Sequence, residues 1–316
     1  MYIRSLDRIC HLLHATKLLK IHIASYTLTN IEAMDIVVSR NGHEGDHSDF
    51  STSHEKVGGK NTPRTTFLAY IGAHEINSSE LWRAAVTETV TTTFFMFTLI
   101  IAIISCFESH DHDPQLLVPF VVFIIAFFFL LAILPLSGCH VNPLISFIAA
   151  LKGVITPVRA SVYILGQCVG SIIGFILIKS VMSHDAVAKY SLGGCAINEN
   201  GDGISQGTAL VLEFVCTFLV LLIGMTVAFD SKRRKELGIP MTCVVIAASI
   251  AIAVYVSIVV TGKPGYAGAG INPARCLGPA LLQQGQLWHG HWVFWLGPFF
   301  ACILYHGFSA TLPKGG

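Results

Sequence analysis

The chain has 316 residues, of which 53% are hydrophobic and only 12% carry a charge, and its formal net charge is +1. Soluble globular proteins carry about twice that charged fraction, so the apolar surplus must face something other than water. A net charge near zero argues against a nucleic-acid partner. The nine cysteines lie mostly in apolar stretches, which excludes a secreted disulfide framework and favours buried free thiols.

Residues 1–80 form the polar part of the chain and hold most of its Ser, Thr, Asn, His and charge. We interpret them as a weakly structured cytosolic tail, and residues 81–316 as one membrane domain. Met1–Lys20 is basic and poor in acids, as organelle targeting segments are. The alternative is that the protein starts at Met34. Neither reading changes the prediction of a membrane domain.

Six apolar blocks are long enough to cross a bilayer as helices, which takes about 20 residues each. They lie at about 81–104, 116–136, 158–181, 207–229, 240–261 and 291–311. Two shorter apolar segments, 142–151 and 272–282, each begin with Asn-Pro. Segments of that length cover about 15 Å, half of the hydrocarbon core. They are predicted to be re-entrant half-helices whose irregular approach is buried in protein or lines a water-filled cavity.

The two halves of the membrane domain repeat, at about 81–181 and 207–311. Each half has a span with a glutamate, a second span, an Asn-Pro segment and a third span. Glu88 lies 54 positions before Asn142, and Glu213 lies 59 before Asn272. Because three spans per half is an odd number, the halves must insert in opposite orientations. Such an inverted repeat places its functional site near the bilayer midplane, where the broken helices meet.

Basic residues near the span ends predict the orientation in the membrane. The 104–116 loop has no Lys or Arg, whereas the 230–239 loop has four and the 151–159 loop has Lys152 and Arg159. With both termini cytosolic, these basic loops all fall inside. Lys189 and Lys263 fall outside, so the distribution of basic residues favours this orientation but does not follow the positive-inside rule at every loop.

The Asn-Pro segments have a physical logic for conduction. Proline suits the first helical position and asparagine is a strong N-cap. Two such half-helices meeting tip to tip bring two positive dipole ends to the midplane, where the Asn amides can donate into a lumen. Uncharged molecules can pass in file while a cation is repelled. This arrangement predicts a passive channel for small neutral solutes.

Two stretches carry a family resemblance: Ser137-Gly-Cys-His-Val-Asn-Pro-Leu144 and Gly270-Ile-Asn-Pro-Ala-Arg-Cys276. They resemble the paired signature loops of aquaporins, the major intrinsic proteins. The Cys in the second box and the missing Ala in the first are most similar to the X intrinsic protein subfamily of plants and fungi. The resemblance implies an all-α, right-handed bundle of six transmembrane helices and two half-helices. It also implies a homotetramer. We expect a multi-pass protein of the plasma membrane, although the sequence does not distinguish this membrane from that of an organelle, and we expect no cofactor or metal.

The resemblance also implies which residues form the pore. The pore midplane would be formed by the two boxes: Asn142, Pro143, Leu144, Asn272, Pro273 and Ala274. The outer selectivity filter would be Val122, Val254, Ala269 and Arg275, with Val256 as the alternative on the fifth span. Small aliphatic walls predict glycerol, urea, hydrogen peroxide or boric acid as cargo, with water passing poorly.

Several residues leave alternatives open. Leu144 stands where the family has Ala, and either repacks the half-helices or narrows the lumen. Glu88 and Glu213 are buried acids that act in a proton relay or, as the resemblance implies, accept hydrogen bonds from the re-entrant loops, with His140 sharing that task.

Cys195 and Cys276 are expected as free thiols, redox gating or an intersubunit bond being the alternative. Three glycines at four-residue spacing predict close helix packing: Gly166, Gly170 and Gly174.

Two other functions compete with a channel: an inverted-repeat secondary transporter, and a junction protein with a closed pore. Transporters usually place coupling acids at their broken helices, whereas here the sequence offers Asn and one Arg. An enzyme is excluded because the sequence shows no nucleophile–base set, metal motif or phosphate loop.

Overall fold

The computed structural model describes residues 67–109, 114–199, 203–261 and 266–311. The possible targeting segment, the start at Met34 and Lys263 lie outside the described residues. Six helices of the described part are long and apolar enough to cross a membrane. The predicted all-α membrane fold is therefore confirmed.

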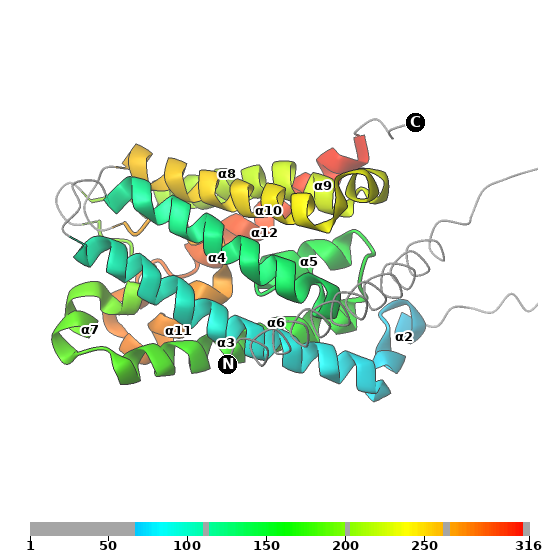
Figure 1. The fold of residues 1–316 in the computed structure, drawn as a ribbon, viewed down its shortest axis with the longest axis horizontal. Helices are drawn as coiled ribbons and strands as arrows, with labels where there is room; N and C mark the ends of the chain where they lie inside the picture. The colour runs from blue at the N-terminus through cyan, green and yellow to red at the C-terminus, as the bar shows by residue number, and fades with distance from the viewer. Residues whose placement is uncertain (1–66, 110–113, 200–202, 262–265, 312–316) are drawn as a thin grey trace, which may run out of the picture. The chain divides into compact units, whose positions relative to one another are not determined.

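The first half of the fold holds three long helices and one short one (Figure 1). They are α3 (Ser79–Glu108), α4 (Pro114–Ser137), α5 (Pro143–Leu151) and α6 (Pro157–Val181). Two short elements, α2 (Phe67–Tyr70) and η1 (Ala73–Asn77), come before α3, and two more, α7 (His184–Tyr190) and η2 (Ser191–Gly193), follow α6. The short helix α5 occupies the place of the first predicted half-helix.

The second half repeats this order. Its first span is α8 (Gln206–Val220), which continues through a π-helical turn, η3 (Leu221–Met225), into α9 (Thr226–Phe229). Then come α10 (Ser231–Thr261), the short α11 (Pro273–Gln283), η4 (Gly285–Trp288) and α12 (Val293–Thr311). The half-helix α11 thus corresponds to α5.

Two boundaries differ from the sequence prediction. The fifth span was expected to begin near residue 240 after a loop, but α10 begins at Ser231 and contains one non-helical residue, Gly238, with φ 74°. The basic residues before Gly238 are good helix formers even though they cannot enter lipid. Residues 67–80, assigned to the tail by composition, form helical segments, because local propensity and contacts with the bundle outweigh their polarity.

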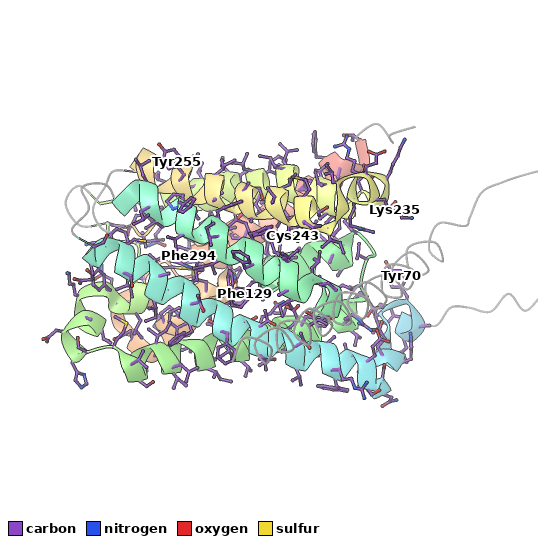
Figure 2. All side chains as sticks on the ribbon, viewed as in Figure 1. Tyr70, Phe129, Lys235, Cys243, Tyr255 and Phe294 are labelled. Carbon is purple, nitrogen blue, oxygen red and sulfur yellow. A yellow bond between two sulfur atoms is a disulfide. The ribbon has the colours of Figure 1, made fainter. Side chains whose placement is uncertain are left out.

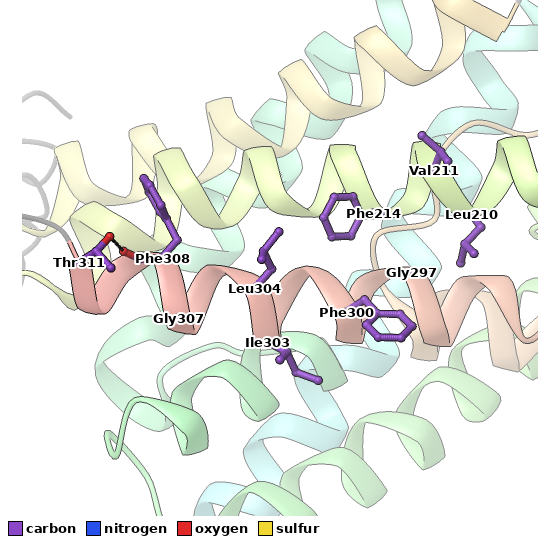
Figure 3. A pocket seen from close by; sticks show the side chains of 10 residues that line it. All are labelled: Leu210, Val211, Phe214, Gly297, Phe300, Ile303, Leu304, Gly307, Phe308 and Thr311. Carbon is purple, nitrogen blue, oxygen red and sulfur yellow. Dashed lines mark hydrogen bonds between the residues drawn. The ribbon is translucent and has the colours of Figure 1, made fainter.

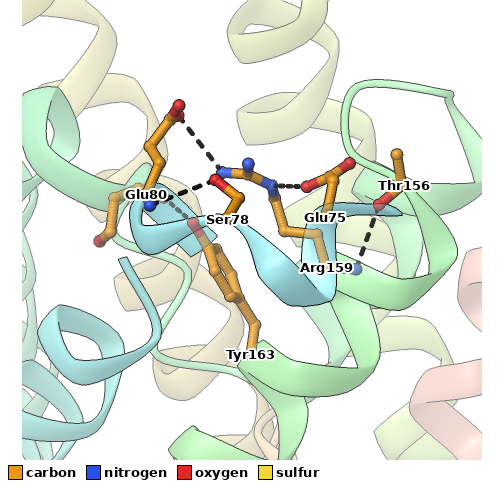
Figure 4. A network of polar contacts seen from close by, with 7 residues as sticks. Glu75, Ser78, Glu80, Thr156, Arg159 and Tyr163 are labelled. Carbon is orange, nitrogen blue, oxygen red and sulfur yellow. Dashed lines mark hydrogen bonds and ion pairs between the residues drawn. The ribbon is translucent and has the colours of Figure 1, made fainter. Parts of the chain in front are cut away.

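An ion pair attaches the segment before α3 to the bundle (Figure 4). The Arg159 Nε of α6 donates to Glu75 Oε2 at 2.7 Å, and its Nη1 lies 3.8 Å from Glu80 Oε1. Thr156 caps α6 by accepting from the Arg159 backbone N–H at 3.1 Å. Residues that precede the first membrane span are therefore attached to the bundle.

The glycines of α6 let it approach α3 closely. A Cβ atom at Gly174 would lie 2.7 Å from the Thr93 carbonyl oxygen, and one at Gly170 would clash with the carbonyl of Thr89. Thr93 Oγ1 donates to the Gly170 carbonyl at 3.0 Å across this contact. The predicted close packing is confirmed. The corresponding helices of the second half meet in the same way, since a Cβ at Gly297 of α12 would lie 2.8 Å from Glu213 Cβ of α8.

The half-helices lie where the two halves meet. The short α5 packs against α6 and α12, while α11 packs against α6, α12 and α5. Phe129, Cys243 and Phe294 lie among the helices in Figure 2, and the latter two are buried. Tyr255, by contrast, lies at the surface. Each half-helix therefore contacts the third span of both halves.

Candidate functional site

The two half-helices begin with the same cap. Asn142 and Asn272 both have extended backbones and precede a proline at the first helical turn. The Asn142 Oδ1 accepts from the Leu144 N–H at 3.0 Å, and the Asn272 Oδ1 accepts from the Ala274 N–H at 3.0 Å and the Arg275 N–H at 3.4 Å. Each side-chain oxygen therefore satisfies backbone donors that the helix itself leaves without partners.

The side-chain amides of the two caps bond across the repeat. Asn142 Nδ2 donates to the Ile271 carbonyl at 3.2 Å, and Asn272 Nδ2 donates to the Val141 carbonyl at 2.9 Å. The two tips thus meet, as predicted for the Asn-Pro segments. A primary amide has two N–H donors, so each Asn keeps a second donor beside the positive end of its half-helix.

The residue before each Asn has an unfavourable backbone. Val141 has φ 42° and Ile271 has φ 56°, a region that β-branched residues rarely adopt. The structure uses both polar groups of each residue: the carbonyl accepts from the opposite Asn, and the N–H donates to a buried glutamate. These bonds offset the strain, which costs about 1–3 kcal/mol per residue.

In the first half that glutamate is Glu88, which is fully buried on α3. Its Oε2 accepts from the Val141 N–H at 2.7 Å and from Gln167 Nε2 at 2.9 Å. Its Oε1 accepts from the His140 N–H at 2.9 Å and from Ser137 Oγ at 2.7 Å. Four donors thus surround one carboxylate, as its burial requires.

The side chain of His140 takes part in the same network. Its Nδ1 lies 3.0 Å from Ser146 Oγ, which also accepts from Gln167 Nε2 at 3.0 Å. Its ring stands edge-on to Tyr163, with centroids 5.4 Å apart. His140 therefore connects the loop to α5 and α6.

In the second half, Glu213 on α8 is equally buried. It accepts from the Gly270 N–H at 2.6 Å, the Ile271 N–H at 3.0 Å and the Tyr266 hydroxyl at 3.3 Å. Sequence reasoning did not identify Gln167 or Tyr266 as partners. Gln167 carried a signal, since a polar residue inside an apolar span needs a partner.

The third position of each box shows where the halves differ. Leu144 is fully buried and belongs to a core cluster with Ile148, Cys302 and Tyr305, and its carbonyl accepts from Cys302 Sγ at 3.7 Å. Ala274 is also fully buried, and its carbonyl accepts from Ser171 Oγ at 2.5 Å. The larger Leu side chain is therefore accommodated by core packing. Pro143 and Pro273 are buried beside them.

The predicted filter positions lie in neighbouring clusters. Val122 is buried with Leu99, Cys106 and Val118, and Ala269 is buried with Cys216, Val220, Ala253 and Ile271. Val254 packs against both of these clusters. The alternative position, Val256, packs in neither.

Arg275 directs its guanidinium toward the segment between α7 and α8. Its Nη1 donates to Cys195 Sγ at 2.8 Å and its Nη2 to the Gly193 carbonyl at 3.4 Å. Cys195 is itself bonded to Cys276, the residue after Arg275, in a disulfide. The expectation of two free thiols was wrong, because two cysteines 81 positions apart in sequence are buried side by side.

The structure contains an apolar groove of about 730 Å³ between α8 and α12 (Figure 3). Its lining includes Val211, Phe300 and Ile303, which are all exposed on the helix surfaces. It therefore lies on the outer surface of the bundle, and neither Asn142 nor Asn272 is among its lining residues. Within the described residues, no group of His, Cys, Asp and Glu side chains could hold a metal ion.

Comparison with known proteins agrees with this geometry. The family model described as "Major intrinsic protein" matches residues 75–306. A probable aquaporin PIP2-6 of Oryza sativa is 35% identical over 53% of this chain and 57% of its own length. A probable aquaporin PIP2-5 of Arabidopsis thaliana is 32% identical over 75% of this chain and 84% of its own length.

The structural comparison concerns the fold. The X-ray structure of the aquaglyceroporin from Plasmodium falciparum superposes with a TM-score of 0.59 at 18% identity. The match covers 73% of this chain and 96% of that one.

Proposed function

Because the chain belongs to the major intrinsic protein family, a family of channels for small solutes, we propose that it conducts small polyols, urea, hydrogen peroxide or boric acid passively, and water poorly. The observation that carries this proposal is the pair of reciprocal amide bonds: the side chain of Asn142 donates to the loop before Asn272, and the side chain of Asn272 donates to the loop before Asn142. Each amide keeps a donor for a passing solute. The two helix N-termini beside them oppose the entry of cations.

The partners of the buried acids support passive conduction. Coupled transport needs an acid that binds and releases an ion or proton at the broken helices. Glu88 accepts four hydrogen bonds and Glu213 three, including the backbone N–H groups that hold the loops. Acids engaged in this way serve the structure, so a secondary transporter is disfavoured. We propose no enzymatic activity.

The choice of solutes rests on the outer filter. Val122, Val254 and Ala269 are small and aliphatic, and Arg275 is the polar member. Such walls leave room for solutes of several heavy atoms and offer few hydrogen bonds to water. The X intrinsic protein subfamily is proposed on the two box motifs alone.

The setting of the channel is part of the proposal. We propose that the chain assembles as a homotetramer, which membership of the family supports, and that it lies in the plasma membrane. We propose that both termini are cytosolic, because basic residues gather near the span ends on that side, notably Lys232–Lys235.

The test is stopped-flow swelling of vesicles that hold the purified full chain, under glycerol, urea and water gradients. We expect glycerol and urea flux above empty vesicles, without saturation and without dependence on a proton or sodium gradient. Uphill accumulation driven by either gradient would show a transporter instead, and tight vesicle adhesion without flux would show a junction protein.

Val122→Phe tests the filter in the same assay. The bulky ring should reduce glycerol and urea flux at least tenfold and water flux less, because larger solutes need the space. Leu116→Phe, an exposed position on the same helix, is the matched control and should leave all fluxes unchanged. Equal loss of every solute would place the constriction elsewhere.

A further inference from the structure

The segment between α7 and α8 is held against the second half-helix by a covalent bond. Cys195 and Cys276 are both 1% exposed, and their Cα atoms lie 5.1 Å apart. Together with Ile197, Val293 and Phe294 they form a buried cluster. The bond therefore lies inside the protein, one residue from Arg275.

The guanidinium of Arg275 is held by this same segment. Both of its described hydrogen bonds go there, to Cys195 Sγ at 2.8 Å and to the Gly193 carbonyl at 3.4 Å. The cap and packing of α11 fix the backbone of Arg275, but the position of its charged end depends on the segment. A long side chain without those partners would adopt several rotamers.

The disulfide also packs on the loop before Asn272. A Cβ atom at Gly270 would lie 2.5 Å from Cys276 Sγ and 3.3 Å from Cys195 Sγ. There is thus no space for the sulfur atoms to separate on that side, and unbonded sulfur atoms must separate to van der Waals contact. On the other side, α11 is fixed to α6 by the bond from Ser171 Oγ to the Ala274 carbonyl.

Among the described residues around the bond, the segment from Ser191 to Cys195 is therefore the part that we expect to shift if the bond is broken. Beyond it, Ile197 stays paired with Tyr266 in a β-bridge. An outward shift of the segment would take the two acceptors of the guanidinium away from the filter. Because Arg275 follows its partners, the constriction would widen.

From these contacts we propose that the Cys195–Cys276 disulfide is a positioning element of the selectivity filter, which fixes the Arg275 guanidinium and so sets the size of solute that passes. The proposal rests on the function proposed above. Its consequence is that the bonded channel discriminates between neutral solutes by size and the reduced channel does so less well.

The experiment measures the ratio of glycerol to xylitol permeability in vesicles holding the full chain. The wild-type protein is measured as purified, after treatment with dithiothreitol, and after reoxidation. The dithiol gives two electrons and two protons to the disulfide and becomes a cyclic disulfide. Oxidised glutathione restores the bond by thiol–disulfide exchange and leaves as two reduced molecules. Alkylation followed by mass measurement counts the thiols in each state.

We expect reduction to lower the permeability ratio at least threefold and reoxidation to restore it. Cys195→Ala and Cys276→Ala should each give the lowered ratio, and the double variant should give the same value as either one, without response to dithiothreitol. Cys168→Ala, a free thiol on α6, is the matched control and should respond like the wild type. Because the wild type is already folded when it is reduced, this arm of the experiment does not depend on the folding of any variant.

An unchanged or higher ratio after verified reduction, with flux present, would overturn the positioning role while leaving the channel function standing. The same holds if the double variant keeps the wild-type ratio. Absence of solute flux in the oxidised wild type would overturn the proposed function and this inference with it.

Discussion

In the first half of the molecule, Glu88 accepts four hydrogen bonds, two of them from side chains on α6 and the end of α4. In the second half, Glu213 accepts three, and one side chain, Tyr266, contributes. The second half adds a disulfide and a β-bridge to its loop, which the first half lacks among the described residues. The same strained turn is thus supported in two ways.

The difference follows the position of Arg275. A charged side chain at membrane depth needs polar partners, and the segment that carries Cys195 supplies them. The first half has no such charge beside its Asn, since the apolar Ile145 stands at the position that corresponds to Arg275. Repeated backbone geometry therefore does not require repeated chemistry.

The largest effect is expected from replacing the two carboxylates. Glu88→Gln should lower the free energy of unfolding by about 4 kcal/mol, because the amide nitrogen that replaces one carboxylate oxygen would face one backbone N–H and one side-chain donor and leave them unsatisfied. Glu213→Gln should cost less, since fewer donors converge there and the disulfide remains. Unfolding by SDS titration in mixed micelles, followed by tryptophan fluorescence, measures both.

The matched control for the carboxylates is Glu80→Gln on the exposed end of α3, which should change stability by less than about 0.5 kcal/mol. If Glu213→Gln proved more damaging than Glu88→Gln, the disulfide would not be compensating for the smaller hydrogen-bond network.

A second effect concerns the unequal third positions of the boxes. Leu144→Ala makes the halves more alike but should cost about 3 kcal/mol, because it leaves a cavity in the core beside Ile148 and Cys302. Glycerol flux should change little, since the side chain is fully buried. Leu281→Ala, 40% exposed on α11, is the control. A large gain in flux for Leu144→Ala would mean that the leucine narrows the lumen.

The smallest effect is expected at the caps. Asn142→Ala and Asn272→Ala should each cost about 1–2 kcal/mol. Asn272→Ala should be the more costly, because its oxygen accepts from two backbone donors and that of Asn142 from one. Ser183→Ala, an exposed cap of α7, gives the reference for a cap alone. Equal losses of stability in the two variants would show that the second backbone donor to Asn272 adds nothing to its cap.

The spans and half-helices were predictable because length and apolar content decide them, and because Asn-Pro marks a helix start. The bracing role of Glu88 and Glu213 came from the family resemblance, and the hydrogen bonds now give its geometry. The pairing of Cys195 with Cys276 was not predictable, since nothing local in the sequence brings together residues so far apart. The helical turn before Gly238 was missed because the prediction followed hydrophobicity, while helix formation needs only suitable backbone propensity.

The reciprocal amide bonds also have a consequence for biogenesis, because each joins a residue of the first half to one that is synthesised much later. The partner of the Val141 carbonyl, Asn272, lies 131 residues later in the chain, and the partner of Asn142, Ile271, lies 129 residues later. At a synthesis rate of about 5–20 residues per second, the ribosome needs about 6–26 seconds to make that stretch. If the first half adopts this turn before the second half is made, its Val141 carbonyl lacks the Asn272 partner during that interval. The nascent chain therefore depends on Glu88, whose donors all come from the first half, to keep that turn in place until the second half arrives.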